Sequence, residues 1–280
     1  MTFLPLTYRC NQKCVFCSAP DSELKRGLAE WIKEARKIKG KLIQISGGEP
    51  LTADTVELLA FLKVCAGEGR TIEFQTNATL IPELDEKIFL KLVGLVELSG
   101  GYFNVNYPAH EKSVDFPVTK LRGGFEKRLA GVKRLLSAGA HVRLTHVLCR
   151  KNFRFVPAFV RHAKKLGGIS WIQFSFVKAA GRAEENKKVV PRYEEAAPYL
   201  NSALRLASKL GIGCEVDHIP VCFIPGFAKL HVDCKKISSG AEGPFVKEKK
   251  KIPACRNCRF SGECAGPRLD YLKIYGGFKP

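Results

Sequence analysis

The chain has 280 residues, which allows one large domain or one domain with an added module, and it is long enough to bury a sizeable core. Hydrophobic residues make up 45% of the sequence and charged residues 26%, so the composition excludes a mainly disordered chain. No secretory signal and no apolar run long enough to span a membrane is visible, which predicts a cytoplasmic protein without a membrane partner.

Two counts bear on function. Lys and Arg number 46 against 27 Asp and Glu, a formal net charge of +19. This excess favours an anionic partner such as RNA, although a basic solvated surface needs no partner. The 11 cysteines, an odd number in a chain without an export signal, indicate metal ligation or catalysis instead of a disulfide framework.

Short apolar runs and segments of helical periodicity alternate along most of the chain. The predicted strands cover residues 3–8, 42–46, 71–76, 95–99, 141–148 and 170–177. The predicted helices cover residues 22–39, 55–66, 82–93, 125–137, 153–166 and 193–210. Six β–α units in series imply an α/β fold with parallel strands, either an open partial barrel or a doubly wound sheet. In both folds ligands collect at the carboxyl ends of the strands.

The chain changes character after residue 211, where helical and strand patterns fade among Gly, Pro and Lys. The cysteines of this segment are Cys214, Cys222, Cys234, Cys255, Cys258 and Cys264. We therefore predict a core domain over residues 1–211 and a Cys-rich module over residues 212–280. This module would be held by metal more than by an apolar core.

The strongest chemical signal is Cys10-x-x-x-Cys14-x-x-Cys17 in the loop after the first predicted strand. Three thiolates on one loop can converge on one metal centre. Three ligands in place of four leave one iron of a four-iron cluster open to a substrate or cofactor. A zinc loop that takes a distant fourth ligand is the alternative.

A second signal, Ser46-Gly47-Gly48-Glu49-Pro50, ends the second predicted strand. Paired glycines let the backbone approach a ligand closely, and they adopt positive φ readily. Glu49 offers a carboxylate that suits an ammonium group. Taken alone, an ordinary turn between a strand and a helix explains the glycine pair equally well.

Together these two motifs, with Phe16 just before the third cysteine, resemble those of the radical S-adenosylmethionine (radical SAM) enzymes. Further stretches that look similar are residues 75–80, with Ala78 where Gly is usual, residues 96–99, residues 142–144 with Asn152, and residues 174–183. The resemblance covers residues 3–183 and implies a partial (β/α)6 barrel.

The resemblance also implies a cofactor site and a reaction. Cys10, Cys14 and Cys17 would ligate a [4Fe–4S] cluster whose fourth iron binds S-adenosylmethionine. The residues implied to contact S-adenosylmethionine are Phe16 near the adenine, Gly47, Gly48 and Glu49 at the amino group, Asn77, and Ser99 and Arg143 at the ribose and carboxylate. Reductive cleavage would give a 5′-deoxyadenosyl radical that abstracts hydrogen from a substrate. The electron donor would be of the flavodoxin or ferredoxin type.

The C-terminal run of cysteines resembles the SPASM or twitch region, which holds an auxiliary iron–sulfur cluster in many radical SAM enzymes. Arg268 stands where another cysteine is expected, which favours one auxiliary [4Fe–4S] cluster. The implied ligands are Cys222, Cys255, Cys258 and Cys264, with Cys234 and then Cys214 as alternatives to Cys222. A structural zinc ribbon has the same spacing and remains an alternative.

Three hypotheses for the function follow. We favour a radical SAM enzyme with one auxiliary cluster that modifies a peptide or protein side chain. The first alternative is a radical SAM enzyme that acts on RNA or on a nucleotide-derived small molecule, which the net charge supports. The second alternative is a non-catalytic, zinc-stabilised binding protein.

Overall fold

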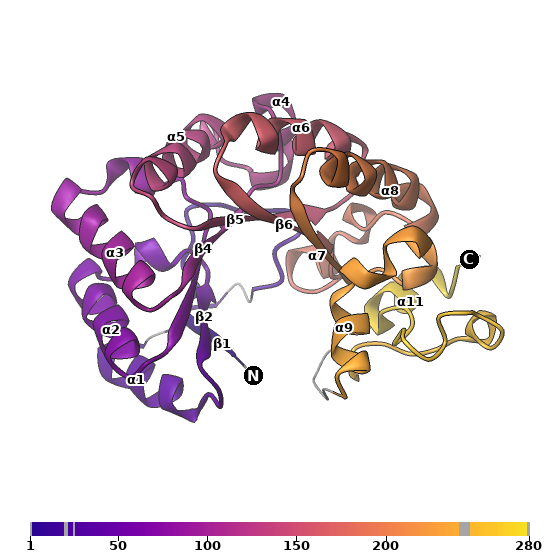
Figure 1. Ribbon diagram of the computed structural model, residues 1–280, viewed down its shortest axis with the longest axis horizontal. Coiled ribbons are helices and arrows are strands. Elements are labelled where there is room, and N and C mark those ends of the chain that lie inside the picture. Colours follow the sequence, from indigo (N-terminus) through magenta and orange to yellow (C-terminus); the bar gives the residue numbers. More distant parts are fainter. Residues whose placement is uncertain (1, 20–21, 25, 241–246, 279–280) are drawn as a thin grey trace.

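The computed structural model describes residues 2–19, 22–24, 26–240 and 247–278. Within these residues seven parallel strands form one sheet in the order β1-β2-β3-β4-β5-β6-β7. The strands are β1 (Phe3–Thr7), β2 (Leu42–Gly47), β3 (Thr71–Thr76), β4 (Tyr102–Asn106), β5 (Val142–Leu148), β6 (Ile169–Phe176) and β7 (Gly213–Asp217). The sheet curves into an open arc whose two edges are β1 and β7 (Figure 1).

The longer helices cover the convex face of this arc (Figure 1). The longer ones are α1 (Leu28–Lys37), α2 (Thr55–Gly67), α3 (Glu86–Leu98), α5 (Gly124–Ser137), α6 (Val156–Leu166) and α8 (Tyr193–Lys209). The shorter ones are α4 (Lys112–Thr119), α7 (Arg182–Glu185), α9 (Val232–Ser238) and α11 (Leu269–Tyr275). The Asp54 and Asp85 carboxylates cap α2 and α3, each accepting two backbone N–H bonds that the helix leaves unpaired. None of the described helices has the length and apolarity needed to cross a lipid bilayer.

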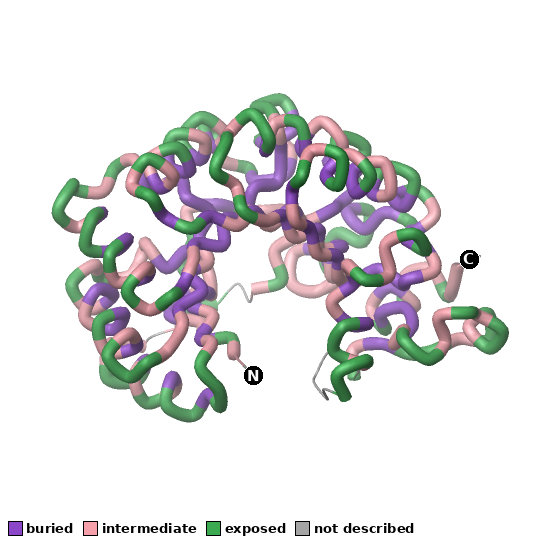
Figure 2. The backbone as a smooth tube through the Cα atoms, viewed as in Figure 1, coloured by how far each residue is buried: buried purple, intermediate pink, exposed green. Residues whose placement is uncertain are grey.

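The two faces of the sheet differ in chemistry because side chains alternate along each strand. On β5, Val142, Leu144 and Leu148 are buried, whereas Arg143 and Thr145 point to the opposite face. The buried set packs under the helices and forms the core of the molecule (Figure 2). Parallel strands usually carry apolar side chains on both faces, so a polar concave face indicates a ligand-accessible surface.

The predicted α/β fold with a parallel sheet is confirmed. The predicted number of six strands is wrong, because Gly213–Asp217 pairs in parallel with β6 as a seventh strand. The sheet of the described residues therefore extends past residue 211, into the segment that we assigned to the Cys-rich module. The first helix, Leu28–Lys37, is also shorter than the predicted span of 22–39.

The predicted fourth strand at residues 95–99 is wrong. These residues form the last turn of α3 and its cap, and β4 follows at Tyr102–Asn106. The reason is that Phe89, Leu92, Val93 and Val96 continue one buried face at helical spacing, so the apolar run belongs to the helix.

Ion pairs join the parts of the C-terminal segment to one another. Lys249 and Asp233 form a buried ion pair, and Lys249 pairs with Arg268 in an isolated antiparallel bridge. The Arg268 guanidinium contacts Glu248 (2.6 Å) and Asp270 (2.9 Å). At the position where another cysteine was expected, Arg268 thus links its own stretch to Glu248 by charge, and Lys249 extends the connection to Asp233.

Candidate active site

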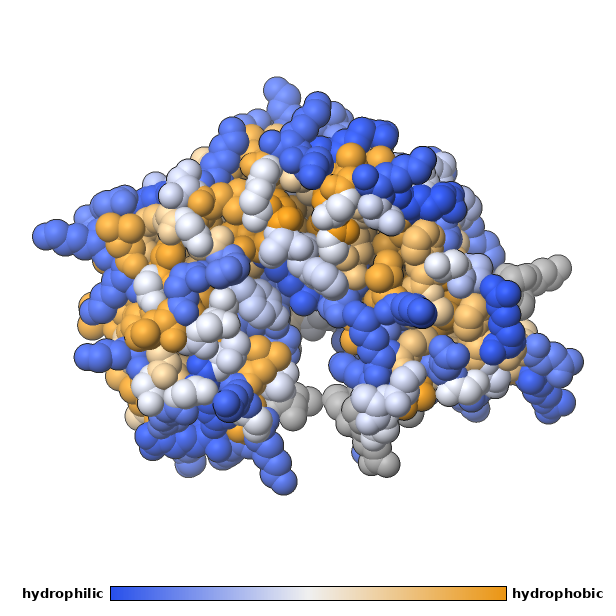
Figure 3. All heavy atoms as spheres, in the orientation of Figure 1, coloured by the Kyte–Doolittle hydropathy of each residue, from blue (hydrophilic) through white to orange (hydrophobic). Residues whose placement is uncertain are grey.

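A cavity of about 720 Å³ lies on the concave side of the sheet, at the carboxyl ends of the strands. Figure 3 shows the molecule hollowed between the two ends of the arc, with hydrophilic residues along the edge of the hollow. The cavity brings together the predicted site residues Cys10, Cys14, Phe16, Cys17, Gly48, Glu49 and Asn77. These residues come from the loops after the first three strands, as the sequence predicted.

The three early thiols lie on one loop at the rim of this cavity. Burial, with smaller contributions from Glu49 and Cys17, raises the pKa of the Cys10 thiol to about 11. Burial and the neighbouring thiols raise the pKa of Cys14 further. Without a metal the thiols of Cys10 and Cys14 stay protonated at neutral pH, so the site fits a cationic metal centre that pairs with thiolates. Among the described residues, no three His, Cys, Asp or Glu side chains form a group that would hold a single metal ion.

Backbone hydrogen bonds hold the cysteine loop on two sides. The amides of Lys13 and Val15 donate to the carbonyls of Thr119 (3.0 Å) and Val118 (2.9 Å) at the end of α4. The Arg182 amide, at the start of α7, donates to the Cys17 carbonyl (3.0 Å). The loop is therefore fixed by segments more than 100 residues away in the chain, which sequence patterns do not reveal.

The glycine pair at the end of β2 lets two backbones come close. A Cβ atom on Gly47, whose φ is +120°, would lie 2.0 Å from the Thr7 carbonyl oxygen. A Cβ on Gly48 would lie 2.0 Å from the Arg9 carbonyl oxygen. The Gly48 and Glu49 amides donate to these same two oxygens, at 2.6 and 2.8 Å. The glycines therefore seat the start of the cysteine loop against β2.

Glu49 is a buried carboxylate at the floor of the cavity, 1% exposed. Its Oε1 accepts from Thr76 Oγ1 (2.7 Å), and its Oε2 accepts from the Asn77 amide (2.7 Å). Burial raises the pKa of Glu49 to about 7, although these bonds and one from the Leu51 amide favour the charged form. A carboxylate that is partly desolvated and incompletely neutralised suits a cationic ligand group.

Asn77 connects the end of β3 to the cysteine loop. Its Nδ2 donates to Asn11 Oδ1 (2.8 Å), and Asn11 in turn donates to Thr79 Oγ1 (2.8 Å). The Asn77 side-chain Nδ2 also lies 3.9 Å from the Cys10 sulfur. Ala78, where Gly is usual in the family pattern, holds the left-handed conformation that this turn requires, with φ at +58°.

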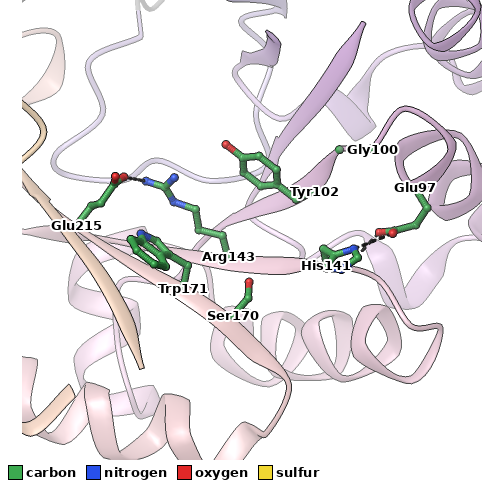
Figure 4. A pocket seen from close by; sticks show the side chains of 9 residues that line it. Glu97, Gly100, Tyr102, His141, Arg143, Ser170, Trp171 and Glu215 are labelled. Atoms are coloured by element: carbon green, nitrogen blue, oxygen red, sulfur yellow. Dashed lines mark hydrogen bonds and ion pairs between the residues drawn. The ribbon is translucent and has the colours of Figure 1, made fainter. Parts of the chain in front are cut away.

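Two predicted cofactor contacts lie elsewhere, and we correct them. Ser99 follows α3 at the amino-terminal side of the sheet, where its Oγ accepts from the Ile72 amide (3.1 Å) and donates to Val96. Arg143 lies near the start of β5 and bonds Gln173 (2.5 Å) and Glu215 (3.2 Å). Figure 4 shows Arg143 in a separate pocket near the amino ends of the strands, turned toward Glu215. Both corrections have the same physical cause, because residues on the amino-terminal side of the sheet cannot reach a site at the carboxyl ends of the strands.

Several further residues line the cavity that the sequence did not single out as site residues. They are Gln12, Thr76, Asn106, Thr145, Ser175, Lys178 and His218. A weak signal was available for three of them, because Thr76, Asn106 and Ser175 are polar residues at or next to the last position of a strand. His218 directly follows β7 and has a left-handed φ of +64°, a conformation that is costly for a non-glycine residue.

A hydrogen-bonded row of polar side chains, the polar belt, crosses the concave face from before β1 to β5. Its members are Thr2, Gln44, Glu73, Gln75, Tyr102, Asn104 and Thr145. Glu73 is its centre and accepts bonds from Gln44 (2.8 Å), Gln75 (2.8 Å), Tyr102 (2.7 Å) and Asn104 (2.6 Å). All members except Tyr102 line the cavity, so a bound molecule meets carboxamide, hydroxyl and carboxylate groups there.

The C-terminal cysteines gather at a second place in the fold. Burial raises the pKa of Cys222 to about 12, and the thiols of Cys264, Cys258 and Cys255 add to this rise. Burial also raises the pKa of Cys234. Of the three C-terminal thiols, Cys264 is the one that contributes to this rise. Cys214 is buried in the apolar core on β7. Of the three upstream thiols, Cys222 thus faces the whole C-terminal set.

The remaining two cysteines, Cys65 and Cys149, are buried in the core at 1% and 0% exposure. They pack as small apolar side chains, away from both thiol sets.

The arrangement defines an α/β enzyme with a cofactor site at the carboxyl ends of its strands. Comparison with known proteins identifies the family, since the model of the Radical SAM superfamily matches residues 4–153. The chain belongs to the radical SAM superfamily. It is accordingly an enzyme that uses a [4Fe–4S] cluster and S-adenosylmethionine.

Two curated proteins of Methanosarcina barkeri (strain Fusaro / DSM 804) are similar to this chain. The AdoMet-dependent heme synthase is 31% identical over 194 residues, which are 66% of this chain and 53% of that protein. The Fe-coproporphyrin III synthase is 31% identical over 162 residues, which are 55% of this chain and 38% of that protein. The chain thus matches only about half, or less, of the length of these relatives.

Among solved structures, Streptococcus suis SuiB bound to S-adenosylmethionine superposes with a TM-score of 0.67 at 13% identity, covering 98% of this chain and 74% of that chain. SuiB was also solved bound to the precursor peptide SuiA. At this identity the likeness concerns the fold.

Proposed function

We propose that Cys10, Cys14 and Cys17 hold the cluster and that Glu49 binds the amino group of S-adenosylmethionine. The three thiols share one loop at the cavity, and the buried Glu49 carboxylate lines the same cavity and raises the pKa of Cys10. When bound, the cluster and S-adenosylmethionine supply an electron and a 5′-deoxyadenosyl radical for hydrogen abstraction. The protein's own part is to bind, orient and shield these groups.

The side chains around the cysteine loop suit the remaining polar groups of S-adenosylmethionine. The Gln12 Nε2 donor is buried and has no partner among the described residues, while its Oε1 accepts from Cys14 (3.2 Å). A free amide donor at this position complements a carboxylate. Phe16 and Asn77 also line the cavity and complete the set that we assign to the cofactor.

The substrate that we propose is a peptide or protein side chain, and the polar belt carries this proposal. The part of the cavity formed by the sheet carries the Gln44, Gln75 and Asn104 carboxamides around Glu73. Carboxamides donate and accept hydrogen bonds as peptide groups do, so they fit a polar chain better than a large apolar ring. The peptide complex of SuiB, a protein of the same fold, supports this assignment.

The two Methanosarcina barkeri relatives favour a second candidate, a haem-type or Fe-coproporphyrin III substrate. These relatives are 31% identical to the chain over the matched residues, against 14% for SuiB in its peptide complex. The hydrogen-bonding groups of the polar belt weigh against it, because a macrocycle needs broad apolar or aromatic walls, and the phenylalanines among the described cavity residues are Phe3 and Phe16. RNA as a substrate, and an electron donor of the flavodoxin or ferredoxin type, remain predictions. The non-catalytic zinc protein is not retained, since the superfamily is one of enzymes.

We also propose one auxiliary [4Fe–4S] cluster on Cys222, Cys255, Cys258 and Cys264. The influence of Cys255, Cys258 and Cys264 on the pKa of Cys222 supports it, as does the position of Cys214 in the core. Arg268, joined to Glu248 and Asp270, has no part in ligation.

The decisive experiment uses the full chain, reconstituted without oxygen with iron and sulfide and then given dithionite and S-adenosylmethionine. We expect 5′-deoxyadenosine to form, to vanish in Cys14→Ala, and to persist in the matched core variant Cys65→Ala. A pool of peptides and Fe-coproporphyrin III are then added in separate reactions. The substrate class is the one whose addition raises 5′-deoxyadenosine formation and whose own mass changes. Equal 5′-deoxyadenosine formation in Cys14→Ala would overturn the assignment of the cluster.

A further inference from the structure

We propose that Arg128 is a positioning residue for the cluster, a buried cation that favours its reduced form. The proposal rests on the assignment of the cluster to Cys10, Cys14 and Cys17. Arg128 is 0% exposed and pairs with Asp115, which is 1% exposed. Arg128 does not have to touch the cluster for this role, because a charge acts over a distance in the weakly polar interior of a protein.

The position of Arg128 follows from three contacts around it. Its partner Asp115 lies on α4, four residues before Thr119, whose hydroxyl donates to Asp115 Oδ2 (3.1 Å). The Thr119 carbonyl, in turn, accepts the Lys13 amide of the cysteine loop. Arg128 therefore lies directly behind the loop that carries the thiols.

The neighbouring turn of α5 gives the same placement from the other side. Gly131, three residues after Arg128, faces Ala78, and a Cβ on Gly131 would lie 2.1 Å from the Ala78 carbonyl oxygen. Ala78 follows Asn77, which contacts the loop at Asn11 and Cys10. Helix α5 thus presses Arg128 into the space between α4 and the turn after β3.

The charge of Arg128 is only partly matched. One guanidinium nitrogen bonds Asp115, while Nε and Nη2 have no hydrogen-bond partner among the described residues. Asp115 is the better satisfied partner, because its Oδ2 also accepts the Thr119 hydroxyl. The pair therefore leaves part of its positive charge uncompensated behind the cysteine loop.

A positive field has a definite effect on an iron–sulfur cluster. One-electron reduction adds a negative charge to a centre that already carries thiolates, so a nearby cation stabilises the reduced state more than the oxidised state. Removing the pair should make reduction harder, whereas removing only Asp115 should make it easier. Opposite signs for the two changes separate this role from a purely structural one.

The test measures the midpoint potential of the cluster in the full, iron-loaded chain by titration followed by electron paramagnetic resonance. Each variant is also made with Cys222→Ser, so that the signal comes from the cluster at the early cysteines. We expect Arg128→Met with Asp115→Leu to lower the ratio of reduced to oxidised cluster about tenfold at a fixed potential, which is about 59 mV for one electron. Asp115→Asn should raise that ratio, and Arg128→Lys should stay near the parent.

Arg205→Met, which removes an exposed arginine of α8, is the matched control and should leave the potential unchanged despite the same loss of charge. An unchanged potential in both the double variant and Asp115→Asn overturns the proposal. Should the double variant fail to load iron, the sign of the Asp115→Asn shift decides alone. Failure of the proposed function looks different, since Cys14→Ala would then keep the parent's iron and its 5′-deoxyadenosine formation.

Discussion

The Glu49 Oε2 atom accepts a hydrogen bond from the Asn77 backbone amide at 2.7 Å, and this bond joins the ends of β2 and β3 beneath the cysteine loop. The same carboxylate accepts from Thr76, so its position is fixed by the strand next to it. Glu49 and Asn77 each belong to a stretch that resembles a family motif. Their contact explains why the two motifs work as one site.

The first prediction concerns the charge of Glu49. We expect Glu49→Gln to keep the parent's iron content but to weaken binding of S-adenosylmethionine about 10-fold to 100-fold, because a charged hydrogen bond is lost. Titration calorimetry on the iron-loaded chain measures the affinity. Equal affinity in the variant would contradict the role that we assign to Glu49.

The pH dependence of this carboxylate gives a second, independent prediction. Its pKa is about 7 in the folded chain against 4.5 for an ordinary glutamate, so the folded state binds the proton more tightly than the unfolded state. The stability that this proton contributes is present below pH 4.5 and is lost as pH rises through 7. We expect Glu49→Gln to show less decline in free energy of unfolding than the parent over this range, measured by urea denaturation of the iron-free chain. The same slope in both proteins would refute it.

The glycine contacts lead to a prediction about the cysteine loop. Gly48→Ala places a methyl group against the Arg9 carbonyl oxygen, and neither backbone can give way without moving the loop. We therefore expect a loss of more than about half of the iron bound at the early cysteines. Iron and sulfide per chain after reconstitution measure it.

Gly94→Ala is the matched control for this change. Gly94 lies exposed in α3, and a Cβ there meets no atom within 4 Å. The substitution should stabilise the helix by up to about 1 kcal/mol and leave iron binding unchanged. If Gly48→Ala binds as much iron as Gly94→Ala, the glycine pair is not needed to position the cysteine loop.

The sequence predicted those parts of the fold that depend on local pattern. Strands such as Thr71–Thr76 and helices such as α2 have clear periodicity and end at Gly or at capping Asp residues, so they were found. The run at residues 95–99 was misassigned because an apolar stretch that ends a helix looks like a buried strand. Strand β7 escaped notice because only Cys214 and Val216 are buried in it, within a segment dominated by cysteines.

The site shows the same division between local and distant information. The thiols and Glu49 belong to compact motifs, and the structure brings them together as expected. Ser99 and Arg143 were placed by weak similarity, which does not tell one end of a strand from the other. The polar belt and Arg128 depend on side chains that meet across different strands and helices, so no single stretch of sequence carries a signal for them.

The auxiliary cluster gives a prediction that separates two cysteines. Two four-iron clusters correspond to about eight irons per chain, and loss of one ligand set lowers this toward about four. We expect Cys222→Ser to lose iron in this way and Cys234→Ser to keep the parent's content, because Cys222 faces all three C-terminal thiols. Loss of iron in Cys234→Ser with retention in Cys222→Ser would reverse the assignment.

The last prediction concerns the polar belt, whose stability depends on one carboxylate. Glu73 is 3% exposed and accepts four hydrogen bonds. Glu73→Leu leaves all four donors without this acceptor, and we expect it to reduce the free energy of unfolding by about 3 kcal/mol or more. Tyr102→Phe removes one of these donors and should cost about 1 kcal/mol. Urea denaturation of the iron-free chain compares the two, and equal losses would show that Glu73 does not organise the belt. Iron content should stay at the parent's level in both variants, because the cysteine loop is held by α4, β2 and α7 and not by the belt.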